Sequence, residues 1–119
     1  VRQVVTLNQA SFEAQVYPIL RSTCAASCHQ AVGSNQATPP GTSFVENRFV
    51  LTGDPKGDFN VTLTMIDDTC HPATNLLLSK PSTVPHPANA AAQTTAVLPA
   101  GSANYNAIAA WIQTGCPTP

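Results

Sequence analysis

Charged side chains are scarce in this chain of 119 residues, since Lys, Arg, Asp and Glu make up only 9% of it and the formal net charge is −1. An average soluble domain carries about 25% charged residues. Five cations cannot form the basic stripe that binds nucleic acid or a polybasic patch for a membrane surface. The sequence also lacks any apolar run near the roughly 20 residues that a spanning helix needs. We therefore expect no nucleic-acid partner and no membrane span.

An initiator methionine, a positively charged leader and an apolar signal segment are also lacking, and the sequence begins at Val1. We expect an exported protein, periplasmic or extracellular, from which a signal peptide has been removed. Four cysteines in so short a chain agree with an oxidising compartment or with a cofactor that uses thiols. The length suits one domain.

Periodic apolar residues predict helices and no sheet. Residues 1–7 are β-prone and are expected to form an extended arm, followed by a single domain over residues 8–119. Asn8 is a candidate N-cap for a first helix, in which Pro18 should cause a kink or start a new turn. The apolar stripe of this helix consists of Phe12, Val16, Ile19 and Leu20.

Three further helices are expected. The segment 58–68 fits either a helix or a strand, and the helix is favoured because Asp58 can cap it. A short helix through 76–78 would be capped by Thr74 and would end before Pro81. The last helix would begin after Ser102 and end at Gly115, with Tyr105, Ile108, Trp111 and Ile112 on one face. Residues 30–53 and 81–101 read as long irregular segments, which are uncommon in a small domain unless they wrap something.

The residues that indicate chemistry are Cys24 and Cys28, followed at once by His29. A CxxCH motif attaches c-type haem, because the two thiols add across the vinyl groups and the histidine binds iron from the proximal side. In this chain the spacer between the cysteines has three residues, Ala25, Ala26 and Ser27. His29 still follows the second cysteine directly, so the motif is a CxxxCH variant.

The flanking sequences support the haem interpretation. The stretch from Phe12 to Leu20 that leads into the cysteines resembles the first helix of single-haem cytochrome c domains. The C-terminal half is similar to a subgroup of bacterial cytochrome c domains in which a Ser-x-Leu-Leu-x-Lys-Pro stretch, an HGGG-like loop and a helix with Tyr and Trp follow in order. This chain has Asn75-Leu76-Leu77-Leu78-Ser79-Lys80-Pro81, then His86-Pro87-Ala88-Asn89, then Gly101-Ser102-Ala103-Asn104-Tyr105 through Trp111-Ile112-Gln113-Thr114-Gly115. The likeness spans residues 8–117 and is weak between 30 and 53.

The resemblance implies a small all-α cytochrome c-like domain with long loops around one covalent haem c. Cys24 and Cys28 would form the thioethers and His29 would be the proximal iron ligand. His86 occupies the place of the histidine in the HGGG-like loop and is the first candidate for the distal ligand. His71 is the next candidate, followed by Met65, for which core packing is the other interpretation. Candidate haem contacts are Phe44, Tyr105 and Trp111, and the last two fit plain core packing equally well.

Cys70 and Cys116 are the cysteines that remain once haem takes the other two, and neither position is usually cysteine in the similar domains. We therefore predict a disulfide between them. Closing a loop of this length would add about 4 kcal/mol on the chain-entropy model. An alternative uses Cys70 and His71 to attach a second haem through one thioether.

The leading hypothesis is an electron-transfer protein with bis-His ligation rather than an enzyme. Its partners would be redox proteins or copies of itself, because low charge and the arm would allow a homopolymer that relays electrons by strand addition. One alternative is a haem protein with an open distal site that acts as a peroxidase or binds gases. The other is a secreted interaction module without haem, in which Cys24 and Cys28 form a local disulfide or bind zinc with Cys70, His71 or Cys116.

Overall fold

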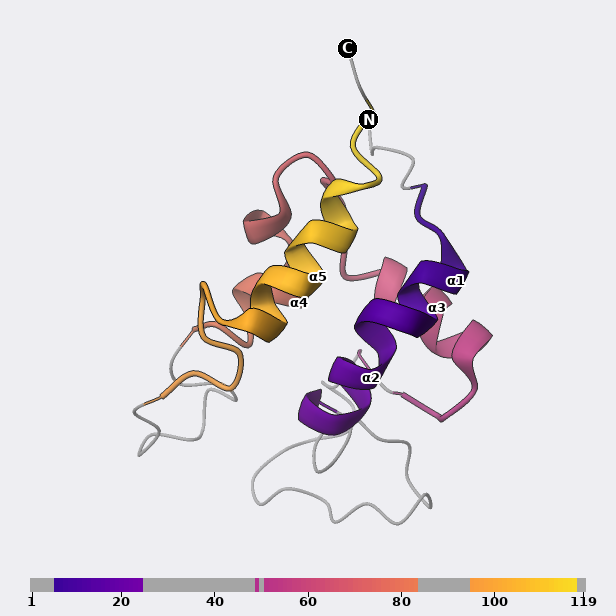
Figure 1. Ribbon diagram of the computed structural model, residues 1–119, viewed down its shortest axis with the longest axis horizontal. Helices are drawn as coiled ribbons and strands as arrows, with labels where there is room; N and C mark the ends of the chain where they lie inside the picture. Colours follow the sequence, from indigo (N-terminus) through magenta and orange to yellow (C-terminus); the bar gives the residue numbers. More distant parts are fainter. Residues whose placement is uncertain (1–5, 25–48, 50, 84–94, 118–119) are drawn as a thin grey trace.

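The computed structural model describes residues 6–24, 49, 51–83 and 95–117. Over these residues the chain is mostly helical and contains no β-strand (Figure 1). This confirms the helical class predicted from the sequence. The predicted arm lies outside the described residues except for Thr6 and Leu7, and so do most of the two long irregular segments.

The first helix runs without interruption from residue 9 to residue 24. It consists of α1 (Gln9–Ser11), the π-helical η1 (Phe12–Val16), α2 (Tyr17–Ile19) and the π-helical η2 (Leu20–Cys24). The side chain of Asn8 accepts a hydrogen bond from the backbone N–H of Ser11 at 2.8 Å. The predicted N-cap is therefore confirmed, and it satisfies one of the amide groups that a helix start leaves without a partner.

Pro18 is accommodated by a change of helical register. The N–H of Tyr17 bonds to the carbonyl of Phe12, five residues earlier, and α2 begins at Tyr17 with the proline in its first turn. A proline has no N–H to donate and is tolerated in a first turn, where the amide would lack a helical partner anyway. The predicted new turn at Pro18 is thus a π-helical bulge followed by a fresh α-helical start.

The second helix, α3 (Pro55–Leu63), begins earlier than the sequence pattern suggested. Its N-cap is Asp54, whose carboxylate accepts from the N–H of Gly57 at 3.2 Å, and Pro55 occupies the first turn. Asp58 is therefore not the cap, and the prediction was wrong at this position because Asp54 and Pro55 supply a stronger start signal. The preference for helix over strand is confirmed.

A short 3₁₀ turn, η3 (Pro72–Thr74), precedes α4 (Leu76–Ser79). The prediction that Thr74 caps this helix was wrong, because Thr74 belongs to the 3₁₀ turn and its hydroxyl bonds to the carbonyl of His71. Asn75 stands at the N-cap position, although its side chain serves the preceding loop instead. The helix ends before Pro81, as the sequence predicts.

The last helix, α5 (Ala103–Gln113), has the predicted N-cap, since the Ser102 hydroxyl accepts from the N–H of Tyr105 at 3.3 Å. The helix has Thr114 as its C-cap, so the predicted cap at Gly115 was wrong, and Gly115 does not have a left-handed backbone. A β-carbon there would lie 2.7 Å from the carbonyl oxygen of Thr6 and 2.9 Å from Cδ2 of Leu7. The segment before the first helix therefore packs directly against the end of the last helix.

The core forms where the first and last helices meet. Figure 1 shows the first helix beside α3, and α5 beside α4, with contacts between η1 and α5 joining the two pairs. The buried apolar side chains come from η1, η2, α3, α4 and α5 and from the segments between helices: Phe12, Val16, Leu20, Phe49, Leu51, Phe59, Ile66, Leu77, Leu78, Leu98, Ile108, Trp111 and Ile112. No helix in the described ranges is long and apolar enough to cross a membrane.

Candidate functional site

The first helix leads directly into the CxxxCH motif. Its last segment, the π-helical η2, ends at Cys24, so the chain enters the motif from a helical turn. The side chain of Cys24 and the residues Cys28, His29, Phe44 and His86 lie outside what the structure describes. What the structure does describe is the scaffold on either side of these residues.

Trp111 ties the last helix to the first. The indole is fully buried, its ring centroid lies 5.4 Å from that of Phe12, and its Nε1–H donates to the hydroxyl of Ser11 at 3.2 Å. A buried indole N–H usually finds such a partner, because leaving it without one would cost free energy. The sequence allowed either core packing or haem contact for Trp111, and the structure describes its packing against the first helix. Tyr105, in the first turn of α5, is partly buried against the same core.

Met65 follows α3 and packs against the core with its side chain partly exposed. It also lines a surface hollow of about 440 Å³ together with Thr64, Asp67, Thr74 and Leu76. The contacts described for the Met65 side chain are thus packing contacts.

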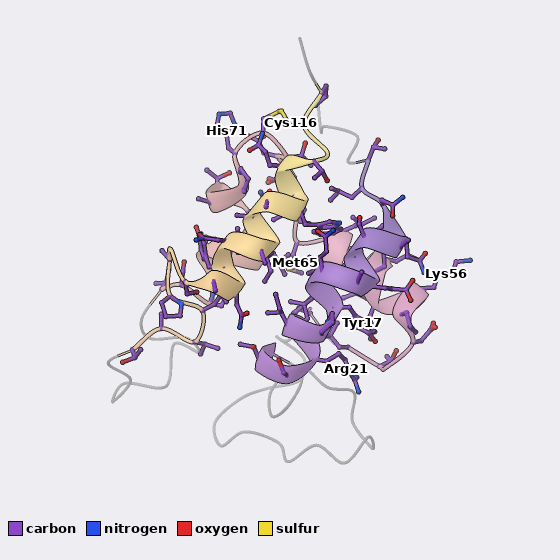
Figure 2. All side chains as sticks on the ribbon, in the orientation of Figure 1. Tyr17, Arg21, Lys56, Met65, His71 and Cys116 are labelled. Carbon is purple, nitrogen blue, oxygen red and sulfur yellow. A yellow bond between two sulfur atoms is a disulfide. The ribbon has the colours of Figure 1, made fainter. Side chains whose placement is uncertain are left out.

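His71 lies far from the helix end that precedes the motif. Figure 2 shows His71 beside Cys116 at one end of the molecule, and Arg21, close to the end of the first helix, at the other. The histidine side chain is 71% exposed, and its Nδ1 lies 2.8 Å from a carboxylate oxygen of Asp68. That hydrogen bond lowers the pKa of Asp68.

Cys70 and Cys116 form a disulfide, as the sequence predicts, with their Cα atoms 4.7 Å apart. The bond links the loop after α3 to the residue that follows Gly115. Because both sulfurs are used, neither can be a zinc thiolate or carry a thioether. The disulfide thus argues against a second haem attached through Cys70 and against a zinc site completed by Cys70 or Cys116.

The loop that carries Cys70 is organised by the buried side chain of Asn75. Its oxygen accepts from the N–H groups of Asp67 at 2.8 Å and Asp68 at 2.9 Å. Its nitrogen donates to the carbonyls of Asp68, His71 and Pro72, at 2.9, 3.3 and 3.0 Å. One amide thus bonds to five backbone groups and fixes the loop in position for the disulfide.

A second polar cluster, which the sequence analysis missed, lies between the first helix and α3. The carboxylate of Asp58 is fully buried. It accepts hydrogen bonds from the Tyr17 hydroxyl, from the N–H and hydroxyl of Thr52 at 2.8 and 3.2 Å, and from the N–H of Gly53 at 2.9 Å. A buried carboxylate with four donors is fully satisfied. No local pattern could reveal this pair, because Tyr17 and Asp58 are 41 positions apart.

The surroundings of Tyr17 keep its phenol protonated. Burial and the bond to Asp58 raise the pKa of Tyr17 to about 12, while Arg21 acts in the opposite direction. The guanidinium of Arg21 lies over Gly53, where a β-carbon would be 3.5 Å from Nη1. Gly53 has a φ of 93°, which glycine adopts without strain. The cluster thus joins the first helix to the segment that leads into α3.

Within the described ranges, no group of three or more His, Cys, Asp and Glu side chains could hold a metal ion. No family model, curated protein or solved structure matches the chain. The candidate chemistry therefore rests on the residues themselves.

Proposed function

We propose that this protein transfers electrons by means of one covalently bound haem c. Cys24 and Cys28 would hold the group through thioether bonds, and His29 would bind the iron from the proximal side. His86 is the proposed distal ligand. With both axial positions filled, no site remains on the iron for a substrate, which suits a carrier rather than an enzyme.

The observation that carries this proposal is how the four cysteines are used. The disulfide takes Cys70 and Cys116, so the remaining cysteines are the two of the motif, and a histidine follows the second of them directly. The motif supplies two thiols and one imidazole within six residues, and the disulfide leaves no other cysteine to join them as a zinc thiolate. The same three groups are what covalent haem attachment requires.

The helical scaffold supports the same conclusion. The helix that ends at Cys24 is held at its other end by Trp111 of α5 and is joined to α3 through Tyr17. A covalently attached group needs a rigid element on at least one side of its attachment point, so that the metal geometry changes little between redox states. The first helix meets that need.

Bound haem supplies a reversible one-electron couple at its iron. The chain would tune that couple through its ligands, because two imidazoles give a lower potential than an imidazole with a thioether. We therefore expect a potential below that of His/Met cytochromes. The partners would be other redox proteins or neighbouring copies of the chain, with the homopolymer relay as the assembled form.

The disulfide also supports an exported location. Disulfides persist in oxidising compartments and are rare where glutathione and thioredoxin keep thiols reduced. Covalent haem and the Cys70–Cys116 bond would then both be formed outside the cytoplasm. We propose the periplasm or the cell exterior.

Paired cysteine variants test the proposal. The double variant Cys24→Ala/Cys28→Ala should lose covalent haem, seen as loss of the visible absorption bands and of the haem mass in denatured protein. The matched control is Cys70→Ala/Cys116→Ala, which removes the same number of sulfurs and should keep the haem. Native protein with the mass of the bare polypeptide contradicts the proposal.

Histidine variants test the distal ligand. Replacing His86 with alanine should convert the split low-spin spectrum of the reduced protein to a high-spin one and permit rapid CO binding. His71→Ala is the control, because His71 lies far from the end of the first helix, where the motif begins. Rapid CO binding by the unaltered protein would instead favour the open-site alternative, and an unchanged spectrum in both variants would direct attention to Met65.

A further inference from the structure

The phenol of Tyr17 and the carboxylate of Asp58 form a pair that electron transfer through haem does not use. The hydroxyl donates to Oδ2 of Asp58, which is fully buried, while the tyrosine ring is partly exposed. A phenol loses its electron far more readily when its proton can move to a nearby base at the same time. The carboxylate already holds the hydrogen bond along which such a proton would move.

The ring of Tyr17 also stands at the end of a row of aromatic side chains. It stacks on Phe12 with ring centroids 5.3 Å apart, and Phe12 lies 5.4 Å from Trp111 and 5.3 Å from Phe59. These rings join the buried indole to the partly exposed phenol through direct contacts. The two side chains of the row that can be oxidised, Trp111 and Tyr17, are therefore linked by a short packed path.

We propose that Tyr17 is a second redox centre of this protein, a one-electron donor whose proton passes to Asp58. Oxidation breaks the O–H bond of Tyr17: one electron leaves for a one-electron oxidant, such as an organic radical or a high-potential metal complex. The proton forms an O–H bond on Oδ2 of Asp58. The products are a neutral tyrosyl radical and a protonated carboxyl, and rereduction of the radical returns the proton to the phenol.

Trp111 has no comparable base beside its N–H, so we expect the radical to settle on Tyr17 rather than on Trp111. The indole N–H donates to the hydroxyl of Ser11, and a neutral hydroxyl is a poor proton acceptor beside a carboxylate. If Trp111 were oxidised first, an electron would pass to it from Tyr17 by way of Phe12, and proton transfer to Asp58 would stabilise the resulting tyrosyl radical. The raised pKa of Tyr17 agrees with this direction, because the resting phenol keeps its proton until oxidation.

This activity needs no haem, so it can be tested whether or not the proposed function holds. The full-length protein is illuminated with ruthenium tris-bipyridine and persulfate, which produce a soluble one-electron oxidant. Samples frozen after the flash are examined by electron paramagnetic resonance for a neutral tyrosyl radical. The chain has only two tyrosines, so Tyr105→Phe is a matched control for Tyr17→Phe.

The tyrosyl signal should appear in the unaltered protein and in Tyr105→Phe and should be lost in Tyr17→Phe. Asp58→Asn keeps the shape of the side chain but removes the base. It should slow radical formation by about 100-fold, the lower range for loss of a positioned proton acceptor. A signal that persists in Tyr17→Phe, or a rate unchanged in Asp58→Asn, overturns the proposal.

Measurements on the unaltered protein remain decisive if a variant does not fold. Radical formation should be slower in D₂O than in H₂O, because the proton moves with the electron. A nitroso spin trap followed by peptide mass spectrometry should then find the adduct on Tyr17. Equal rates in the two solvents, or an adduct on Tyr105 alone, overturn the assignment.

Discussion

Removing the disulfide gives the largest stability change that the structure allows us to calculate. Cys70 and Cys116 are 46 positions apart. Constraining a loop of that size lowers the entropy of the unfolded chain by about 13 cal/mol/K, or about 4 kcal/mol at 25 °C, on the chain-entropy model. Small domains have a total stability of about 5–15 kcal/mol, so the disulfide would supply a large share of it. Cys70→Ala/Cys116→Ala should lower the free energy of unfolding by this amount.

The same number predicts the thermal shift. The entropy of unfolding scales with length, and for a chain of this size 1 kcal/mol corresponds to about 4 °C. The double variant should therefore melt roughly 16 °C below the unaltered protein. Urea unfolding followed by far-UV circular dichroism measures the free energy directly, and unaltered protein with the disulfide reduced should behave like the variant.

If the disulfide acts on the unfolded chain, its removal should leave the folded structure unchanged. Asn75 and the contact of Gly115 with Thr6 hold both ends of the bond independently of the sulfurs. The near-ultraviolet circular dichroism of Trp111 should therefore be unchanged in the double variant. A loss of stability below about 1 kcal/mol would refute the reasoning, because the unfolded chain would then have little entropy for the crosslink to remove.

Four other changes have expected outcomes. Asn75→Ala should lower the free energy of unfolding by about 3 kcal/mol, since it removes the hydrogen-bond acceptor of the Asp67 and Asp68 N–H groups, and urea titration measures this. Gly115→Ala should cost about 1–3 kcal/mol, because its β-carbon would meet a backbone oxygen at 2.7 Å; an unchanged melting temperature contradicts that contact. Because the pKa of Tyr17 is raised from 10.0 to about 12 on folding, the protonated phenol contributes stability that is fully present below pH 10.0 and is lost as the pH rises through about 12. Comparing the free energy of unfolding of the unaltered protein and of Tyr17→Phe across this pH range measures that contribution. Deleting residues 1–5 should reduce the particle size in light scattering if the arm joins copies, and an unchanged size contradicts that role.

Local sequence patterns correctly predicted where two helices begin. Asn8 and Ser102 each accept a hydrogen bond from an N–H three residues later, so both partners lie within one short stretch of sequence. The start of α3 was misplaced because two acidic residues four positions apart can both act as caps. Asp54 is the N-cap, whereas the Asp58 carboxylate is buried and accepts a hydrogen bond from Tyr17 of the first helix.

The residues of the candidate site also fall into those that the sequence shows and those that only the structure shows. The motif of Cys24, Cys28 and His29 is visible in the sequence because the haem attachment proposed for it requires neighbouring residues. The disulfide pair was inferred by assigning the other cysteines first. The pair of Tyr17 and Asp58 could not be inferred, since neither residue carries a local pattern that names its partner.

The sequence by itself determined the helical class and two helix caps, and it supplied the motif on which the proposed haem attachment rests, because each depends on groups within a few positions of one another. The tertiary structure decided which distant groups meet: Tyr17 with Asp58 across 41 positions, and Trp111 with Ser11 across 100. The physical reason is that a buried polar group must find a partner somewhere. Its choice depends on the packing of whole helices, which no short stretch of sequence encodes.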